Sequence, residues 1–164
     1  MLETQLKLSP TDQGRPIDAD AFAEAEFEEP FRYERVKGRL VVMSSSGLAH
    51  TRMISAILER LYLYKHNSKD VIDLIAPEGW MRAADHTDRV GDIAIYLAGH
   101  EHPEQIYDMV PDLVFEVVSE GSEERDYVLK RKEYYDLGIQ EYAIVDPFRK
   151  IVVVLTPNGE GYAD

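Results

Sequence analysis

Residues 113–118 (LVFEVV) place one carboxylate, Glu116, inside an otherwise apolar run. Such a run of β-branched and aromatic residues is typical of a strand that is covered on both faces of a sheet. An unpaired carboxylate there would cost several kcal/mol, which is comparable to the stability margin of a whole domain. The fold must therefore supply Glu116 with a proton, a cationic side chain or a metal ion.

The composition is that of an ordinary soluble protein, with 164 residues, 45% hydrophobic and 30% charged. This length suits one domain with a sizeable core. The sequence contains no apolar run near the ~20 residues of a membrane span and no secretory signal pattern. The absence of cysteine excludes disulfides, thiolate metal sites and cysteine nucleophiles, and it suits a cytoplasmic location.

The net charge of −13 disfavours nucleic-acid binding, because phosphate contacts come from lysine and arginine. The basic residues are nevertheless clustered rather than evenly spread. The two clusters are Arg32, Arg35, Lys37 and Arg39, and Arg125, Lys130, Arg131 and Lys132. The sequence is therefore compatible with a local basic groove on an acidic protein, and also with a protein that never meets a polyanion.

Hydrophobic periodicity and turn residues predict an α/β fold with helices packed on a mixed sheet. We expect a flexible tail over residues 1–16 and a single domain over residues 17–164. The expected helices are 18–27, 49–66 and 124–137, the last ending at Gly138 in a left-handed C-cap. The expected strands are an N-terminal β-hairpin over 31–43, and then 70–76, 80–82, 92–97, 113–118, 141–145 and 151–155.

Three charged residues occupy positions that are not expected at the protein surface. Glu116 is the first, and Asp92, at the leading end of an apolar strand, is the second. Lys130 is the third, because it shares one stripe of its helix, at ~100° per residue, with inward-facing residues. The other members of this stripe are Tyr127, Tyr134 and Leu137.

Two carboxylates on neighbouring strands repel each other, which raises the pKa of one of them. A divalent cation between them removes this penalty, and ligation by oxygen alone suits Mg²⁺ or Mn²⁺. A lysine beside the metal can orient a water molecule or stabilise a developing oxyanion. This combination is suited to the hydrolysis of a phosphodiester.

These residues also carry a family resemblance. Residues 110–119 (VPDLVFEVVS) resemble the signature strand of a bacterial family described as putative restriction endonucleases, formerly a domain of unknown function. This family belongs to the PD-(D/E)XK nuclease superfamily. The resemblance covers roughly residues 30–156, and its specificity lies in the order and spacing of the matches. The other matches are Tyr33, Glu34, Gly38, Met43, His50, Lys130, Tyr134, 138–142 and 145–147.

The resemblance implies an αβββαβ nuclease core with a metal ion held by Asp92 and Glu116. In the superfamily pattern a lysine follows two residues after the strand glutamate, where this chain has Val118. The chain therefore resembles those nucleases in which the lysine has moved to the following helix, which indicates Lys130. Family members usually have proline where this chain has Gly91. They also often continue for about one more strand, so the sequence ends early relative to them.

Each candidate has a structural alternative. Glu116 would form a buried salt bridge with an arginine of the hairpin, Asp92 would be a strand-end turn residue, and the stem of Lys130 would pack on tyrosine. Glu34 is either an extra acid near the metal or the partner of a neighbouring arginine. His50 contacts phosphate or substrate, or is a structural histidine.

We therefore expect a Mg²⁺- or Mn²⁺-dependent endonuclease that hydrolyses DNA. The expected catalytic residues are Asp92, Glu116, Lys130, Glu34 and His50, of which Asp92 and Glu116 hold the metal. A homodimer is compatible with this activity, since two subunits can cut two strands. The rival hypotheses are a catalytically silent binding or regulatory protein on a nuclease fold, which the acidity favours, and a hydrolase of small phosphate esters. The sequence does not distinguish DNA from RNA as substrate.

Overall fold

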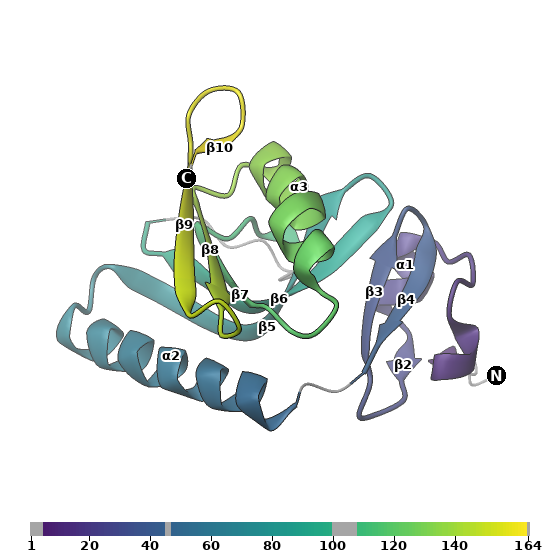
Figure 1. The fold of residues 1–164 in the computed structure, drawn as a ribbon. Helices are drawn as coiled ribbons and strands as arrows, with labels where there is room; N and C mark the ends of the chain where they lie inside the picture. Colours follow the sequence, from purple (N-terminus) through teal and green to yellow (C-terminus); the bar gives the residue numbers. More distant parts are fainter. Residues whose placement is uncertain (1–4, 45–46, 100–107, 164) are drawn as a thin grey trace.

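The computed structural model describes residues 5–44, 47–99 and 108–163, whose centre is a mixed β-sheet with helices on both faces (Figure 1). The strands are β1 (Lys7–Leu8), β2 (Glu26–Phe27), β3 (Arg32–Val36), β4 (Arg39–Met43), β5 (Ile72–Ala84), β6 (Thr87–Leu97), β7 (Leu113–Val117), β8 (Glu141–Asp146), β9 (Ile151–Pro157) and β10 (Tyr162–Ala163). The helices are the 3₁₀ turn η1 (Pro10–Asp12), α1 (Ala19–Ala23), α2 (Leu48–Asn67), the π-helical turn η3 (Arg125–Leu129) and α3 (Lys130–Leu137).

The main sheet has the order β10-β9-β8-β7-β6-β3-β4, and β5 pairs with β6 in addition. Strands β7 and β8 are parallel, and the other neighbours are antiparallel. In chain order, α2, β5, β6, β7, α3 and β8 form the αβββαβ core that the sequence predicted. The predicted α/β class with an N-terminal hairpin, β3–β4, is thus confirmed.

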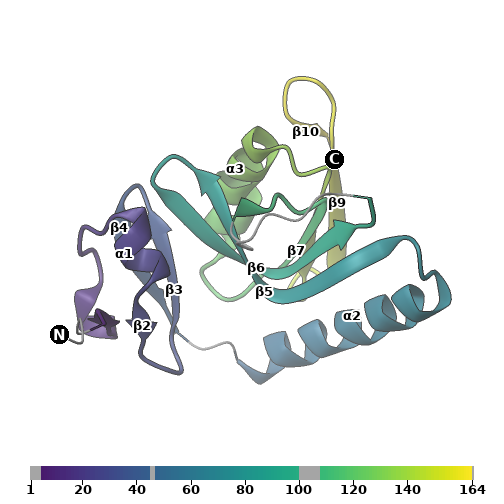
Figure 2. The same cartoon turned by 180° about the vertical axis from the view of Figure 1, so that it is seen from behind.

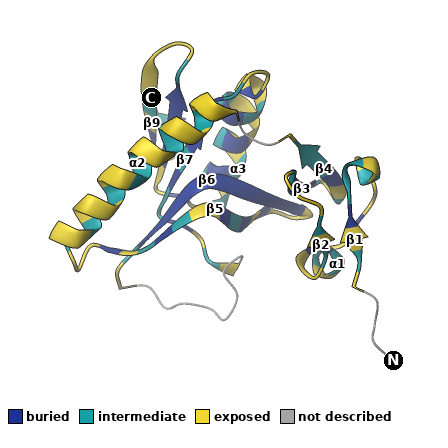
Figure 3. Cartoon of the chain, turned by 90° about the horizontal axis from the view of Figure 1, so that it is seen from below, coloured by how far each residue is buried: buried dark blue, intermediate teal, exposed yellow. Residues whose placement is uncertain are grey.

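The alternation of side chains along β6 explains why a helix covers each face of the sheet. Ile93 and Ile95 belong to the cluster that packs against the apolar stripe of α2. Ala94 and Tyr96 point to the opposite face and pack with Tyr134 of α3. Figures 1 and 2 show the two helices on opposite sides of the sheet, and Figure 3 shows β6 as the buried centre beneath an outwardly exposed α2.

The central hairpin is longer than predicted. Strand β5 runs without a break from Ile72 to Ala84, although the sequence analysis split it at Pro77. Among the described residues β5 pairs with β6 alone, and proline is tolerated in such an edge strand because no second neighbour needs its missing N–H. Strand β6 begins at Thr87, so Asp92 lies in the middle of a strand rather than at its leading end.

The N-terminal segment also differs from the prediction. We expected a flexible tail over residues 1–16, but β1 pairs in parallel with β2, and Leu8 is fully buried. Leu8 joins Phe22, Tyr33 and Leu40 in a second small core. Helix α1 is shorter than predicted, because the chain leaves it to form β2.

The helix predicted over residues 124–137 corresponds to η3 and α3, and its C-terminal end agrees closely with the prediction. Gly138 adopts a left-handed conformation with φ of 96°, and the Ile139 N–H donates to the Tyr134 carbonyl at 3.0 Å. This is the C-cap that the sequence indicated. The first turn is a π-helix instead of an α-helix, a departure that is common near functional sites. No helix among the described residues is long and apolar enough to cross a membrane.

Candidate active site

The site lies where the sheet divides. Strand β6 pairs with β7 through residues 93–95 and with β3 through Asp88, so residues 89–92 lie between the two neighbours. Carboxylates replace the missing strand partners there. Glu34 accepts a hydrogen bond from the Val90 N–H at 3.2 Å, and Asp92 accepts one from the Val117 N–H at 2.8 Å. The divergence of the strands therefore fixes both acids.

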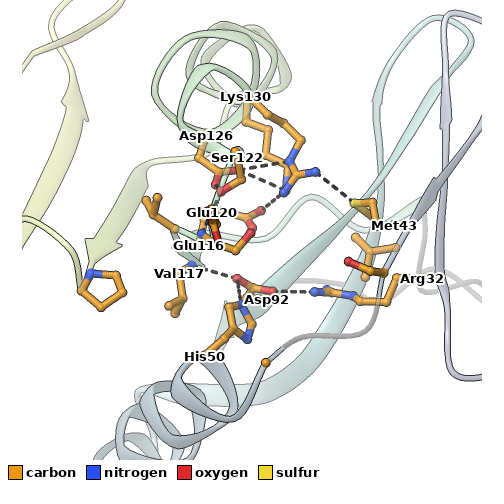
Figure 4. A pocket seen from close by; sticks show the side chains of 18 of the residues that line it. Arg32, Met43, His50, Asp92, Glu116, Val117, Glu120, Ser122, Asp126 and Lys130 are labelled. Carbon is orange, nitrogen blue, oxygen red and sulfur yellow. Dashed lines mark hydrogen bonds and ion pairs between the residues drawn. The ribbon is translucent and has the colours of Figure 1, made fainter.

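A cavity of about 650 Å³ opens at this division (Figure 4). Its walls come from the hairpin β3–β4, the middle of β6, the first turn of α2, the C-terminal end of β7 with the loop after it, the turn after β8, and the beginning of the η3–α3 helix. All five predicted site residues line it: Glu34, His50, Asp92, Glu116 and Lys130. Residues that are far apart in the sequence thus share one concave site, the usual location for catalysis.

Lys130 and Glu116 form the centre of the site. The Lys130 ammonium donates to Glu116 Oε1 at 2.8 Å, and the Tyr134 hydroxyl donates to the same oxygen at 2.6 Å. Both charged side chains are buried, at 2% and 3% exposure. The Lys130 nitrogen also lies 3.8 Å from Glu34 Oε1 and 3.9 Å from Asp126 Oδ1. The structural alternative for Lys130, in which its alkyl chain packs on tyrosine and its ammonium lies in solvent, is wrong because Lys130 is buried.

Asp92 has a different set of partners (Figure 4). Arg32 donates to Oδ1 at 2.8 Å, and His50 Nε2 lies 3.0 Å from Oδ2, which also accepts the Val117 N–H. His50 lies in the first turn of α2, which brings its side chain next to Asp92 of β6. The structure therefore gives His50 a contact with the predicted metal ligand, at the wall of the cavity.

The two central acids have pKa values that are shifted in opposite directions. Burial raises the pKa of Glu116 to about 7, and the charges of Asp92 and Asp126 add to this effect, against the opposing charge of Lys130. Burial acts on Asp92 in the same direction, but the His50 hydrogen bond and the Arg32 charge outweigh it and hold the pKa of Asp92 below its usual range. A pair of acids separated in this way is typical of active sites.

Lys130 stays protonated at neutral pH. Burial alone would lower the pKa of Lys130, but the charges of Glu116, Glu34 and Asp126 outweigh burial and raise it. A lysine in this state is a cation and a hydrogen-bond donor, and it is not a base. In this state it can stabilise negative charge near it.

Glu34 pairs with an arginine, which was one of the two alternatives that the sequence left open. It lies near Lys130, and it also accepts a hydrogen bond from Arg89 Nη1 at 2.7 Å. Arg89 in turn holds Glu133 of α3 at 2.8 Å. Burial would raise the pKa of Glu34, but Lys130 and Arg89 lower it, so Glu34 is an anion that anchors α3 to the hairpin.

Three features of the site were not predicted. The sequence analysis noted Arg32 only as a member of a basic cluster and named a hairpin arginine only in the structural alternative for Glu116, whereas Arg32 pairs with Asp92. Asp126 was not singled out, although its position four residues before Lys130 signals a shared helix face. Tyr134 was assigned to the inward-facing stripe of its helix, and its hydroxyl was given no role. Asp112, which immediately precedes β7, accepts the Leu97 N–H at 2.7 Å and so has a backbone role.

The donors at this site are carboxylate oxygens, the type of ligand that hard divalent cations prefer. Asp92 and Glu116 offer carboxylate oxygens in one cavity, and Mg²⁺ is commonly bound through one or two carboxylates with water and substrate oxygens completing its shell. Across residues 5–44, 47–99 and 108–163, no three His, Cys, Asp or Glu side chains are grouped to hold a metal ion. Asp92 and Glu116 as metal ligands stay a prediction of the sequence analysis.

The αβββαβ core and the acidic cavity at its dividing sheet define a protein with the restriction-endonuclease fold. A sequence model of the family Uma2, described as "Putative restriction endonuclease", matches residues 19–164, and the chain belongs to this family.

Among the solved structures that match is a chain from Anabaena variabilis ATCC 29413, titled as a putative nuclease belonging to DUF820. Its TM-score is 0.72 over 88% of this chain and 82% of that chain, with 18% sequence identity, which supports the fold alone. A search of curated proteins found no match.

Proposed function

We propose that this protein is a Mg²⁺- or Mn²⁺-dependent endonuclease that hydrolyses phosphodiester bonds in DNA. One observation carries the proposal: the buried Lys130 ammonium lies 2.8 Å from Glu116 in the cavity that Asp92 also lines. A buried cation between acids on a concave wall is costly, and structural packing does not require it. The family of the chain supports the same reaction class.

Asp92 and Glu116 are the residues that would hold the ion. When bound, a divalent ion supplies a water molecule of lowered pKa and neutralises charge on the phosphate. Lys130 would offset the negative charge that develops on the phosphate oxygens. Glu34 and Asp126 keep Lys130 charged and in place. Arg32 and His50 border the same space and can contact phosphate oxygens beside Asp92.

The test compares two lysines of the same helix. Lys130→Met removes the buried cation, whereas Lys132→Met removes an exposed one whose side chain is 78% accessible. In a plasmid-nicking assay with Mn²⁺, we expect Lys130→Met to lose at least ~10²-fold in rate, as for other electrostatic groups in active sites. Lys132→Met should cleave like the wild type. Equal cleavage by Lys130→Met would refute the assignment of Lys130.

A second candidate function is a nuclease-fold protein that binds without turnover. The net charge of −13 favours it, because this charge repels DNA at long range. Calorimetric titration with Mn²⁺ separates the two functions. Metal binding that is lost in Asp92→Asn supports the endonuclease, whereas DNA binding that is independent of metal supports the silent binder. The homodimer and the cytoplasmic location stay predictions.

A further inference from the structure

One exposed aromatic side chain lies on the wall of the candidate active site. Phe148 is 63% exposed and lines the cavity that contains Glu116 and Lys130. The other large apolar side chains that are exposed among the described residues, such as Val152 and Val154 on β9, do not line it. Packing in the core therefore does not explain why an aromatic residue is at position 148. Its side chain is placed to contact a ligand that enters the cavity.

The turn between β8 and β9 holds Phe148 in this position. Asp146 Oδ1 accepts the N–H groups of Phe148 and Arg149, both at 2.9 Å, and the Tyr127 hydroxyl donates to Asp146 Oδ2 at 2.9 Å. Asp146 is 2% exposed, so a buried carboxylate anchors the backbone that carries the exposed ring. An aromatic ring on an anchored turn loses little conformational entropy when a ligand covers it.

The position of Phe148 relative to the acids follows from the sheet. Glu116 of β7 is in register with Ile144 of β8, which lies in parallel beside it (Figure 1). Phe148 comes four residues after Ile144, so it lies at most ~13 Å further along the strand direction, at the rise of an extended chain. This distance spans a few nucleotides of a bound strand. Phe148 thus lies within the length of a few nucleotides from Glu116 along the strand direction.

The cationic side chains of the cavity bear on the chemical class of the ligand, although carboxylates share the wall with them and most of these pair with them: Glu34, Asp92, Glu116, Glu120 and Asp126. The wall also presents the cations Arg32, Arg125 and Lys130. Arg125, whose side chain is 30% exposed, lies where the hairpin β3–β4 approaches η3, with its Nη1 3.2 Å from the Met43 sulfur. Cations beside an exposed aromatic ring form the pattern that binds a nucleic-acid strand, with phosphates on the cations and a base on the ring.

We propose that Phe148 stacks on an unpaired nucleobase of the substrate strand, so that the protein prefers single-stranded or locally unpaired nucleic acid to continuous duplex. In a duplex each base is already stacked on its neighbours, and a side chain can cover its face only where the base is unpaired or splayed out. This inference rests on the proposed endonuclease function, and it adds the form of the substrate.

The test measures binding in the presence of Ca²⁺, so that binding is separated from Mg²⁺- or Mn²⁺-dependent turnover. A fluorescein-labelled single-stranded oligonucleotide reports affinity by anisotropy, and a relaxed closed-circular plasmid serves as the duplex competitor. We expect Phe148→Ala to weaken single-strand binding by at least ~5-fold, the lower end of base–aromatic stacking. Its affinity for the duplex should change less than about twofold, since no stacking on duplex bases is lost.

Two further variants make the test specific. Phe148→Trp should keep the affinity, and its indole fluorescence should be quenched on binding against the background of the single native tryptophan, Trp80. Val152→Ala, on the same hairpin with 60% exposure but away from the cavity, should bind like the wild type. Phe148→Ala keeps the backbone N–H that Asp146 accepts, so the turn should remain folded.

The outcomes distinguish the two proposals. If the wild type binds the single strand and Phe148→Ala binds it equally well, the stacking inference is overturned and the endonuclease proposal stands. Equal losses on single strand and duplex also overturn it, because they indicate a general effect on the site. If the wild type binds neither nucleic acid, the proposed function itself fails.

Discussion

Replacement of Lys130 by methionine should make the stability of the metal-free protein depend more strongly on pH. The substitution keeps a long unbranched side chain but removes the cation that contacts Glu116 at 2.8 Å. The pKa of Glu116 is raised to about 7 from 4.5, first by burial and then by neighbouring acids, and Lys130 opposes this rise. Without Lys130, the pKa of Glu116 must therefore rise further.

The direction of the effect follows from proton linkage. Between pH 4.5 and 7 the folded state keeps a proton on Glu116 that the unfolded state has lost, so the free energy of unfolding falls as the pH rises. One proton corresponds to about 1.4 kcal/mol per pH unit, so Glu116 costs the wild type about 3 kcal/mol across this window. Glu34 and Asp92 titrate below this window, because their folded pKa values are lowered.

In the variant the decline continues above pH 7, whereas in the wild type the contribution of Glu116 has ended. The destabilisation of Lys130→Met should therefore be about 2 kcal/mol larger at pH 8.5 than at pH 5.5. Urea unfolding of chelator-treated protein, followed by circular dichroism at both pH values, measures this difference. Lys132→Met provides the control for loss of one positive charge. A destabilisation by Lys130→Met that is the same at both pH values would refute the electrostatic reasoning.

Two other substitutions test parts of the structure that the active-site argument uses. Arg32→Met should tighten Mn²⁺ binding severalfold in calorimetry, because the guanidinium no longer competes with the ion for Asp92 Oδ1; unchanged or weaker binding would contradict this competition. Gly138→Ala should lower the free energy of unfolding by about 1 kcal/mol, because φ at this position is 96°, a conformation that alanine adopts with strain. The loss should be no larger, since the added Cβ would meet only open space. An unaltered urea midpoint would show that the left-handed cap contributes nothing.

The sequence predicted those parts of the fold in which local pattern and tertiary environment agree. The strand around Glu116 and the C-cap at Gly138 each have an unambiguous local signal, and both are present. Strand β5 was split in two because Pro77 interrupts its pattern, and only the position of β5 beside a single neighbour makes that proline harmless. Leu8 was assigned to a tail because a strand as short as β1 has no readable period.

The candidate site was predictable in its acids and its lysine, but its other charged partners were not. The helical stripe placed Lys130 on an inward face without any knowledge of its partner. The contact between Arg32 and Asp92 joins residues 60 positions apart, and it exists because β3 and β7 separate along β6. No local pattern encodes where two strands diverge, so the cation that neutralises Asp92 emerges only from the assembled sheet.

The packing of β7 gives a physical reason why this chain has valine at position 118 and a lysine on α3. Val118 follows Glu116 by two residues, so both side chains lie on one face of the extended chain. Val118 is 1% exposed and belongs to the core cluster that contains Tyr134. A lysine there would replace an apolar contact between the sheet and α3. Lys130 reaches the same Glu116 oxygen from α3, with Tyr134 beside it, so the ammonium enters the site while the core beneath it stays apolar.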